Sequence, residues 1–262
     1  MNPDQIAQAF CQARTHGTAL LSFPGGEVPP TLEDAYLVQD AAIAAWPDQV
    51  VAWKVALIAP AWQAQYKNVR LSGPVFAKRL RLCTDAQTTN ERIIDGGIAA
   101  TETEFAIRVN DQFPLYTRFD SQEQLAPYIA SVHAAIEVAG SPLATLGTLG
   151  PGAMISDFGN NTALLIGPEL PGFFSRDPSA WRTSMYINAR PVGEGHAARI
   201  PDGPLAALLF LVNNLVDRGT TLRPLQWVST GASNGIHPVK PGDHAEAFFD
   251  DRLLLSVRLD TV

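Results

Sequence analysis

Apolar residues recur with helical spacing at the N-terminal end of the chain. The dipeptide Asn2-Pro3 predicts a capped helix that runs to about Thr15, because asparagine is favoured at the cap and proline in the first turn. The stretch Thr31-Leu-Glu-Asp34 resembles a capping box, with aspartate in place of the usual glutamate or glutamine. It predicts a second helix through Ala45, which Pro47 terminates. The chain therefore begins with two helices joined by a loop rich in glycine and proline.

Two later segments also have a helical pattern. One begins at Asp202-Gly-Pro-Leu205 and is closed by Gly219, and it is apolar on nearly all sides, so we expect it to be mostly buried. The other is Ser121 to His133, with Ser121 as a candidate N-cap. The stretch from Gly140 to Gly152 is rich in Gly, Pro, Ser and Thr and predicts a loop.

Alternating apolar and polar positions and β-branched residues predict strands in the rest of the chain. The predicted strands are residues 50–57, 100–109, 133–138, 226–230, 245–249 and 252–259. The last two are expected to form a hairpin with Asp250-Asp251 at its turn. A helical start, strands, one central helix and further strands are typical of an α+β fold and not of a βαβ series. We divide the chain into an N-terminal helical segment, 1–48, and a β-rich domain, 49–262.

Composition and charge restrict the function classes. The chain has 262 residues, 46% of them hydrophobic and 17% charged, which indicates an ordinary globular protein. Its net charge is −7 and it has no basic cluster, which argues against nucleic acid or an anionic membrane as a partner. An N-terminus without a signal-peptide pattern and two isolated cysteines, Cys11 and Cys83, predict a cytoplasmic protein with reduced thiols. The longest strongly apolar run, Leu205 to Val212, is too short to span a membrane.

Two glutamates on the predicted strand 100–109 are the first candidates for chemistry. Side chains two positions apart on a strand point to the same side, so Glu102 and Glu104 lie roughly 7 Å apart along it. Like charges this close repel unless a cation lies between them, and carboxylate oxygens suit Mg²⁺. The alternative is a solvated face of an edge strand, with Arg108 reducing the repulsion. Lys54, on strand 50–57, either extends to solvent at a strand end or reaches into a cavity.

Several segments, in order and spacing over nearly the whole chain, match one known group of enzymes. They are Thr31–Gln39, Ala52-Trp-Lys-Val-Ala56, Glu102-Thr-Glu-Phe-Ala106, His133-Ala-Ala-Ile-Glu-Val138, Ile155–Asn161, Gly203–Leu209 and Thr230–Asp243. Through them the chain resembles the 2-oxopent-4-enoate hydratase and 4-oxalocrotonate decarboxylase group of the fumarylacetoacetate hydrolase superfamily.

The resemblance implies a fold, a metal and an assembly. It implies a mixed β-sandwich or roll of the fumarylacetoacetase C-terminal type, and assembly into homo-oligomers. It also implies that Glu102, Glu104 and Glu137 bind Mg²⁺ or Mn²⁺, and that Lys54 is a catalytic residue in the same site. If burial beside the ion lowers the pKa of Lys54, the amine can transfer protons, whereas as a cation it anchors the substrate.

The sequence departs from the pattern of this family in four places. Ala52 and Ala56 replace the two glycines that flank the family's lysine. The family's Leu-Asp-Asp-Met stretch is replaced near residues 76–80, its Asp-Ser-Arg near residues 140–142, and its Asp-Trp-Lys is missing from residues 144–150. The glutamates that the resemblance implies as metal ligands are thus retained, while the segments that it implies for proton transfer and substrate contact differ.

The resemblance implies a hydratase, that is, a hydro-lyase. In that reaction water adds to a 2-oxo or 2-hydroxydienoic acid by way of an enolate that the metal stabilises. A decarboxylase of a related oxo-dicarboxylate would use the same enolate and is the first alternative. A non-catalytic subunit in a hetero-complex with an active paralogue is the second. Hydrolysis of an acylpyruvate is not favoured, because no His–Glu pair is present to activate water.

Four polar residues are candidates for contacts to the 2-oxo acid substrate. Asp157 and Asn160 either line the pocket or shape a turn, and Thr230 and Ser233 either donate hydrogen bonds to the substrate or belong to a strand end and a loop. His133 is expected to be structural, because metal-spaced histidines are absent from the sequence.

Overall fold

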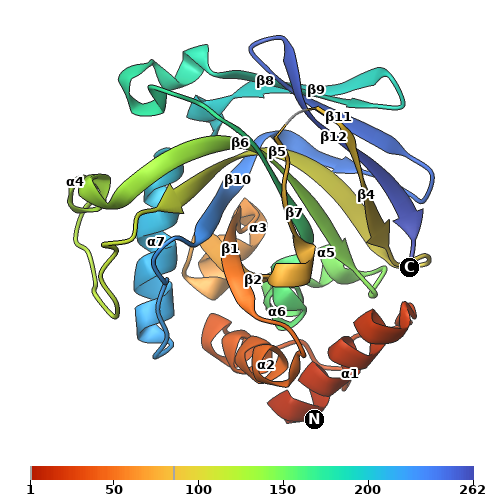
Figure 1. The fold of residues 1–262 in the computed structure, drawn as a ribbon. Coiled ribbons are helices and arrows are strands. Elements are labelled where there is room, and N and C mark those ends of the chain that lie inside the picture. Colours follow the sequence, from red (N-terminus) through yellow and green to blue (C-terminus); the bar gives the residue numbers. More distant parts are fainter. Residues whose placement is uncertain (1, 85) are drawn as a thin grey trace.

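The computed structural model describes residues 2–84 and 86–262, and within these residues the strands form two curved sheets (Figure 1). The larger sheet has the strand order β2-β1-β10-β5-β6-β7-β3, and the smaller has the order β4-β12-β11-β8-β9. Both sheets are mixed, because β1 and β10, β3 and β7, and β4 and β12 pair in parallel while the other neighbours are antiparallel. The strands are β1 Val50–Leu57, β2 Arg70–Phe76, β3 Leu80–Leu82, β4 Thr88–Ile93, β5 Ile98–Val109, β6 Ile129–Ser141, β7 Asn161–Glu169, β8 Arg182–Ile187, β9 Arg190–His196, β10 Trp227–Pro238, β11 His244–Phe249 and β12 Arg252–Thr261.

The helices lie around the two sheets. Figure 1 shows α1 and α2 side by side below the larger sheet, with α5 and α6 between them and the strands. The α-helices are α1 Pro3–His16, α2 Leu32–Ala45, α3 Pro60–Tyr66, α4 Gln122–Leu125, α5 Leu146–Leu149, α6 Pro151–Ser156 and α7 Pro204–Asp217. The 3₁₀ turns are η1 Ala77–Arg79, η2 Ala126–Tyr128, η3 Phe158–Asn160, η4 Phe173–Ser175, η5 Pro178–Ala180 and η6 Ala197–Arg199. In the described part of the chain, no helix has the length and apolar character needed to cross a membrane.

The predicted starts of the two N-terminal helices are confirmed. The backbone N–H of Gln5 donates to the side chain of Asn2 at 2.9 Å, which caps α1. Likewise the backbone N–H of Asp34 donates to the hydroxyl of Thr31 at 3.1 Å and caps α2. Residue 1 of the predicted segment 1–48 lies outside the described residues, and the division of the chain into two domains stays a prediction.

The main core lies between the two sheets and against α7. Phe105, Ile107 and Val109 of β5 face it together with residues of β11, β12 and α7. The predicted burial of helix 202–219 is confirmed for α7, whose buried residues include Leu208 and Leu215. The predicted hairpin is confirmed too, since β11 and β12 pair in antiparallel fashion on either side of the Asp250-Asp251 turn, where both residues have positive φ.

Three local predictions are corrected by the structure. The helix expected over 121–133 ends at Leu125 and a 3₁₀ turn, and the chain joins β6 from Ile129, because those residues pair with β5 and bury their apolar side chains. The loop expected over 140–152 contains the short helix α5 and the start of α6. The strand expected over 226–230 continues to Pro238, through two irregularities in its pairing with β5. The α+β class with mixed, curved sheets and N-terminal helices is confirmed.

Candidate metal centre

Strand register brings the three predicted glutamates together. β5 and β6 are antiparallel neighbours in the middle of the larger sheet, and Glu102 lies directly opposite Glu137. Glu104 is two residues further along β5, so its side chain points to the same face. That face is opposite to the one that carries Phe105 and Ile107 into the main core. Residues 35 positions apart in the chain therefore converge because of the pairing and not because of local sequence.

The cluster is buried. One oxygen from each of Glu102, Glu104 and Glu137 lies within 4.8 Å of the other two, and the exposed fractions of the residues are 5%, 0% and 0%. Ligands on opposite sides of a Mg²⁺ ion lie about 4 Å apart, so small side-chain shifts would bring the three oxygens to one ion. The interpretation of this pair as a solvated face of an edge strand is wrong, because β5 pairs with a strand on both sides.

Neighbouring groups hold two of the three carboxylates and leave one oxygen of each without a hydrogen bond. Glu104 Oε2 accepts hydrogen bonds from the Ser229 hydroxyl and from the Gly231 backbone N–H. Glu137 Oε1 accepts one from Asn161 Nδ2 at 2.9 Å. Glu104 Oε1 is buried and accepts no hydrogen bond, although an unpaired buried acceptor is costly. Glu137 Oε2 has no hydrogen bond either and faces only the Lys54 ammonium group, 3.3 Å away. A divalent cation at this point would contact both oxygens.

Lys54 extends into the cluster and not into solvent. It lies on β1 beside Ser229 of β10, and its side chain is 1% exposed. Its Nζ lies 3.3 Å from Glu137 Oε2 and donates a hydrogen bond to Asn160 Oδ1 at 3.2 Å. Of the two positions that the sequence left open for Lys54, the structure shows the buried one.

The pKa values reflect how crowded the negative charge is. Burial, reinforced by Glu137 and opposed by Lys54, raises the pKa of Glu102 to about 7. Burial and then the charges of Glu137 and Glu102 raise the pKa of Glu104 well above its ordinary value. Burial alone would lower the pKa of Lys54, but the three carboxylates outweigh it and raise that pKa. Among the protein's own groups the lysine is thus held as a cation.

The residues fit a divalent cation in charge as well as in geometry. With all four groups ionised, the three carboxylates and Lys54 leave two negative charges in a buried place. Isolated buried charge is strongly unfavourable, so the protein must take up protons or bind a cation. One divalent ion neutralises the pair of charges, and hard carboxylate oxygens suit Mg²⁺ or Mn²⁺.

The four predicted substrate contacts lie at different places around this cluster. Asn160 is next to it, through Lys54. Asp157 is fully buried and forms an ion pair with Arg14 of α1. The hydroxyls of Thr230 and Ser233 donate to the backbone carbonyls of β5, at residues 105 and 103. Whether these residues contact a substrate stays a prediction.

The structure adds one residue that the sequence did not single out, Arg14, which is a partner of Asp157. It also gives Asn161, the last residue of the matched segment Ile155–Asn161, a hydrogen bond to Glu137. A lone arginine on an amphipathic helix is usually solvent exposed, so no sequence signal pointed to Arg14. His133 has structural contacts, as expected. Its ring packs edge-on against Trp227 at 4.8 Å between centroids and hydrogen-bonds to the Gly167 carbonyl.

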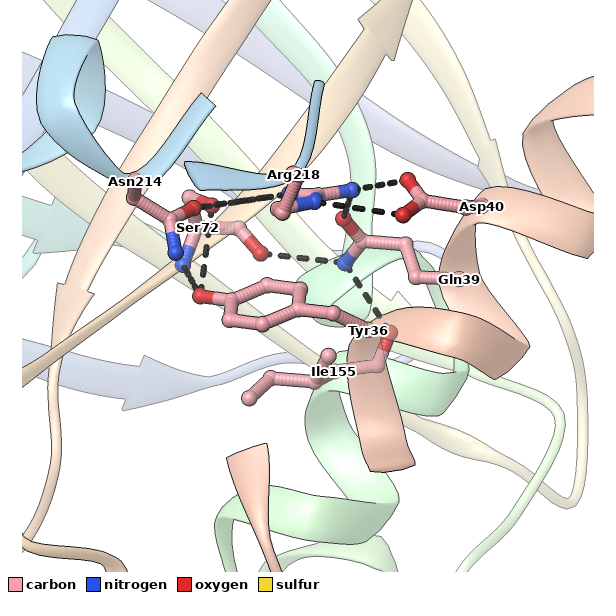
Figure 2. A network of polar contacts seen from close by, with 7 residues as sticks. All are labelled: Tyr36, Gln39, Asp40, Ser72, Ile155, Asn214 and Arg218. Carbon is pink, nitrogen blue, oxygen red and sulfur yellow. Dashed lines mark hydrogen bonds and ion pairs between the residues drawn. The ribbon is translucent and has the colours of Figure 1, made fainter. Parts of the chain in front are cut away.

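A second polar network fixes the helix that precedes Asp157 (Figure 2). The Gln39 side-chain amide donates to the backbone carbonyls of Ser72 and Ile155, at 3.0 and 2.9 Å. Arg218, at the end of α7, donates to Gln39 Oε1 at 2.9 Å and pairs with Asp40. Figure 2 shows these side chains meeting where α2, β2 and α6 come together. The network ties α2 to β2 and to α6, which ends just before Asp157.

Comparison of this structure with solved structures identifies the class of fold. No protein-family model and no curated protein matches the sequence. Solved structures do match, and the fold is that of the fumarylacetoacetate hydrolases and their relatives, which confirms the sequence resemblance at the level of the fold.

One particular fold relative matches over almost the whole chain. 4-Oxalocrotonate decarboxylase from Pseudomonas putida G7, complexed with magnesium and adipate, superposes with a TM-score of 0.81 at 20% identity, covering 98% of this chain and 97% of that one. The same enzyme complexed with calcium and acetate gives 0.79 at 20% identity, covering 98% and 96%. Fumarylpyruvate hydrolase from Pseudomonas aeruginosa, in complex with Mn²⁺ and pyruvate, gives 0.58 at 15% identity, covering 82% and 91%.

Proposed function

We propose that this protein is a divalent-metal-dependent lyase of the fumarylacetoacetate hydrolase superfamily that acts on a 2-oxo acid. The observation that carries the proposal is the buried set of Glu102, Glu104, Glu137 and Lys54, whose two excess negative charges call for a divalent cation. The fold relatives support it, because one was solved with magnesium and adipate and another with Mn²⁺ and pyruvate. We propose Mg²⁺ or Mn²⁺ as the ion.

A bound ion and the side chains of the protein would have different roles in the reaction. A bound divalent ion would supply Lewis acidity, drawing electron density from the oxo group of a chelated 2-oxo acid when a bond at the neighbouring carbon breaks. Ser229 and Gly231 keep Glu104 in place by hydrogen bonds, and Asn161 does the same for Glu137. Lys54, held as an ammonium group beside Glu137, supplies a proton to a carbanion that develops at the substrate.

Between the two reactions considered from the sequence, we favour decarboxylation. In it, the bond to a β-carboxylate breaks, CO₂ leaves, the electron pair passes towards the oxo group, and the carbon then takes a proton from Lys54. This requires one proton donor, which a cationic lysine provides. Hydration requires in addition a base that takes a proton from water, and the family's acidic Leu-Asp-Asp-Met stretch is replaced near residues 76–80. A fold relative that covers 98% of this chain is also a decarboxylase. Hydration remains the second candidate, because the sequence resembles the hydratases equally well.

The experiment that tests the function incubates the purified protein and Mg²⁺ with a 2-hydroxydienoate and, separately, with an oxo-dicarboxylate. Release of CO₂ from the dicarboxylate supports decarboxylation, and loss of dienol absorbance without CO₂ supports hydration. Turnover should disappear in Lys54→Met and after treatment with a chelator. Stabilisation by Mg²⁺ with no turnover of either substrate would favour the non-catalytic partner subunit. The molecular mass of the purified protein in solution shows whether it forms the homo-oligomer that we expect.

A further inference from the structure

Arg14 makes an unusually complete set of contacts for a residue of the N-terminal helix. Its Nε pairs with the Asp157 carboxylate, Nη1 donates to the Asn161 carbonyl at 3.0 Å, and Nη2 donates to the Gly140 carbonyl at 2.9 Å. A second contact of Nη2 reaches the backbone carbonyl of Asp157 at 3.3 Å. The side chain is 10% exposed. One guanidinium group therefore joins α1 to residues 157–161 and to the end of β6.

The segment that Arg14 holds has a backbone that needs support. Three consecutive residues of it, Phe158, Gly159 and Asn160, have φ of 54°, 62° and 56°. Left-handed backbone at residues with a Cβ is disfavoured and persists where the surroundings impose it. On one side the segment is pressed against β2, where a Cβ on Gly73 would lie 2.2 Å from the Phe158 carbonyl oxygen. On the other side the planar fork of Arg14 fixes its two ends.

This same segment supplies two contacts to the metal centre. Asn160 accepts the hydrogen bond of Lys54, and Asn161 donates to Glu137. The third anchor of Arg14, the carbonyl of Gly140, is three residues beyond Glu137 on β6. The guanidinium group thus sets the positions of the partners of Lys54 and Glu137 without touching either residue.

We propose that Arg14 is a positioning residue of the metal centre, so that helix α1 completes the site. The proposal rests on the proposed function to the extent that Glu137 is a metal ligand. Arginine suits this role because its rigid fork addresses several carbonyl and carboxylate acceptors at once, which lysine cannot do. Removing it lets residues 157–161 relax, and Glu137 then loses the hydrogen bond that orients it.

A purely structural role of Arg14, as a link that docks α1, predicts a different result. We therefore pair Arg14→Met with Phe10→Leu, which loosens the packing of the same helix, since Phe10 is fully buried in the core that α1 shares with α2. The measurement is the Mg²⁺ affinity by calorimetric titration, which needs no substrate. Arg14→Met should weaken binding about tenfold, as loss of the groups that orient a ligand usually does. Phe10→Leu should change it by less than about twofold.

A double-mutant cycle tests the route through Asn161. If Arg14 acts by holding Asn161 against Glu137, Arg14→Met should have little further effect in an Asn161→Ala background. Arg14→Lys keeps the positive charge but not the planar fork, so it should show most of the loss of Mg²⁺ affinity. If Arg14→Met does not fold, Arg14→Lys replaces it in every comparison. Unchanged affinity in the variant used, equal loss in Phe10→Leu, or additive effects in the cycle would each overturn the proposal. Failure of the unmutated protein to bind Mg²⁺ would instead overturn the proposed function.

Discussion

The crowded carboxylates lead to an unusual prediction, that Glu102→Gln stabilises the protein when no metal is available. The pKa of Glu102 is raised to about 7, above its ordinary value of 4.5, by burial and by Glu137. A raised pKa means that the folded state favours the protonated, neutral carboxyl. The contribution of protonated Glu102 to the free energy of unfolding is fully present below about pH 4.5 and is lost as the pH rises through about 7. Glutamine resembles the neutral carboxyl at every pH.

The magnitude follows from that pKa. Each pH unit between the two values is worth 1.36 kcal/mol, so ionised Glu102 costs the folded protein about 3 kcal/mol at pH 8. For a chain of this size, each kcal/mol moves the melting temperature by roughly 2–4 °C. Glu102→Gln should therefore melt roughly 6–12 °C above the unmutated protein at pH 8, and within about 3 °C of it at pH 5.

The assay is thermal unfolding in a buffer with a chelator, at pH 5 and at pH 8, repeated with Mg²⁺ in place of the chelator. With Mg²⁺ at about 1,000 times its dissociation constant the order should reverse. The unmutated protein then gains about 4.1 kcal/mol of stability, which exceeds the advantage of the variant, while the variant lacks a ligand and gains little. Glu27→Gln, at an exposed glutamate, is the matched control and should change neither melting temperature.

The reasoning would be refuted by a variant that melts at or below the unmutated protein at pH 8 in chelator. A stabilisation of equal size at pH 5 would also refute it, because the effect would then come from something other than the charge of Glu102. Retention of the full Mg²⁺ response in the variant would show that this carboxylate does not bind the ion.

Three further predictions follow from single contacts. Glu104→Ala should weaken Mg²⁺ binding more than about tenfold while the protein remains folded, because a ligand is lost and not a core side chain; calorimetry would show an unchanged affinity if the triad is not the metal site. Lys54→Met should abolish turnover but keep Mg²⁺-dependent stabilisation, and normal turnover would remove this lysine from the mechanism. Gly73→Ala should destabilise the protein by about 3 kcal/mol, since its Cβ would meet the Phe158 carbonyl oxygen at 2.2 Å; denaturant unfolding measures this, and a neutral result would mean that the turn at Phe158–Asn160 can move aside freely.

The sequence predicted the structure correctly where interactions between residues close in the chain decide it. The caps at Asn2 and Thr31 were predictable, since a cap satisfies backbone donors within its own turn. The turn at Asp250-Asp251 was predictable for a similar reason, because alternating apolar residues on both sides favour a hairpin. The helix expected over 121–133 was wrong, since the pairing of β6 with β5 overrides a local preference that is worth little by itself.

For the site, the sequence determined which residue types are available, and the tertiary structure decided what they can do. Two glutamates on alternate positions of a strand are equally compatible with a solvated face, and the difference lies in β5 being paired on both sides. Burial then removes the water that would screen Glu102, Glu104 and Glu137, and this turns an ordinary acidic strand into a cluster that needs a cation. Neither the register that sets Glu102 opposite Glu137 nor the reach of Arg14 to residues 157–161 has a local signal, because both depend on contacts between segments far apart in the chain.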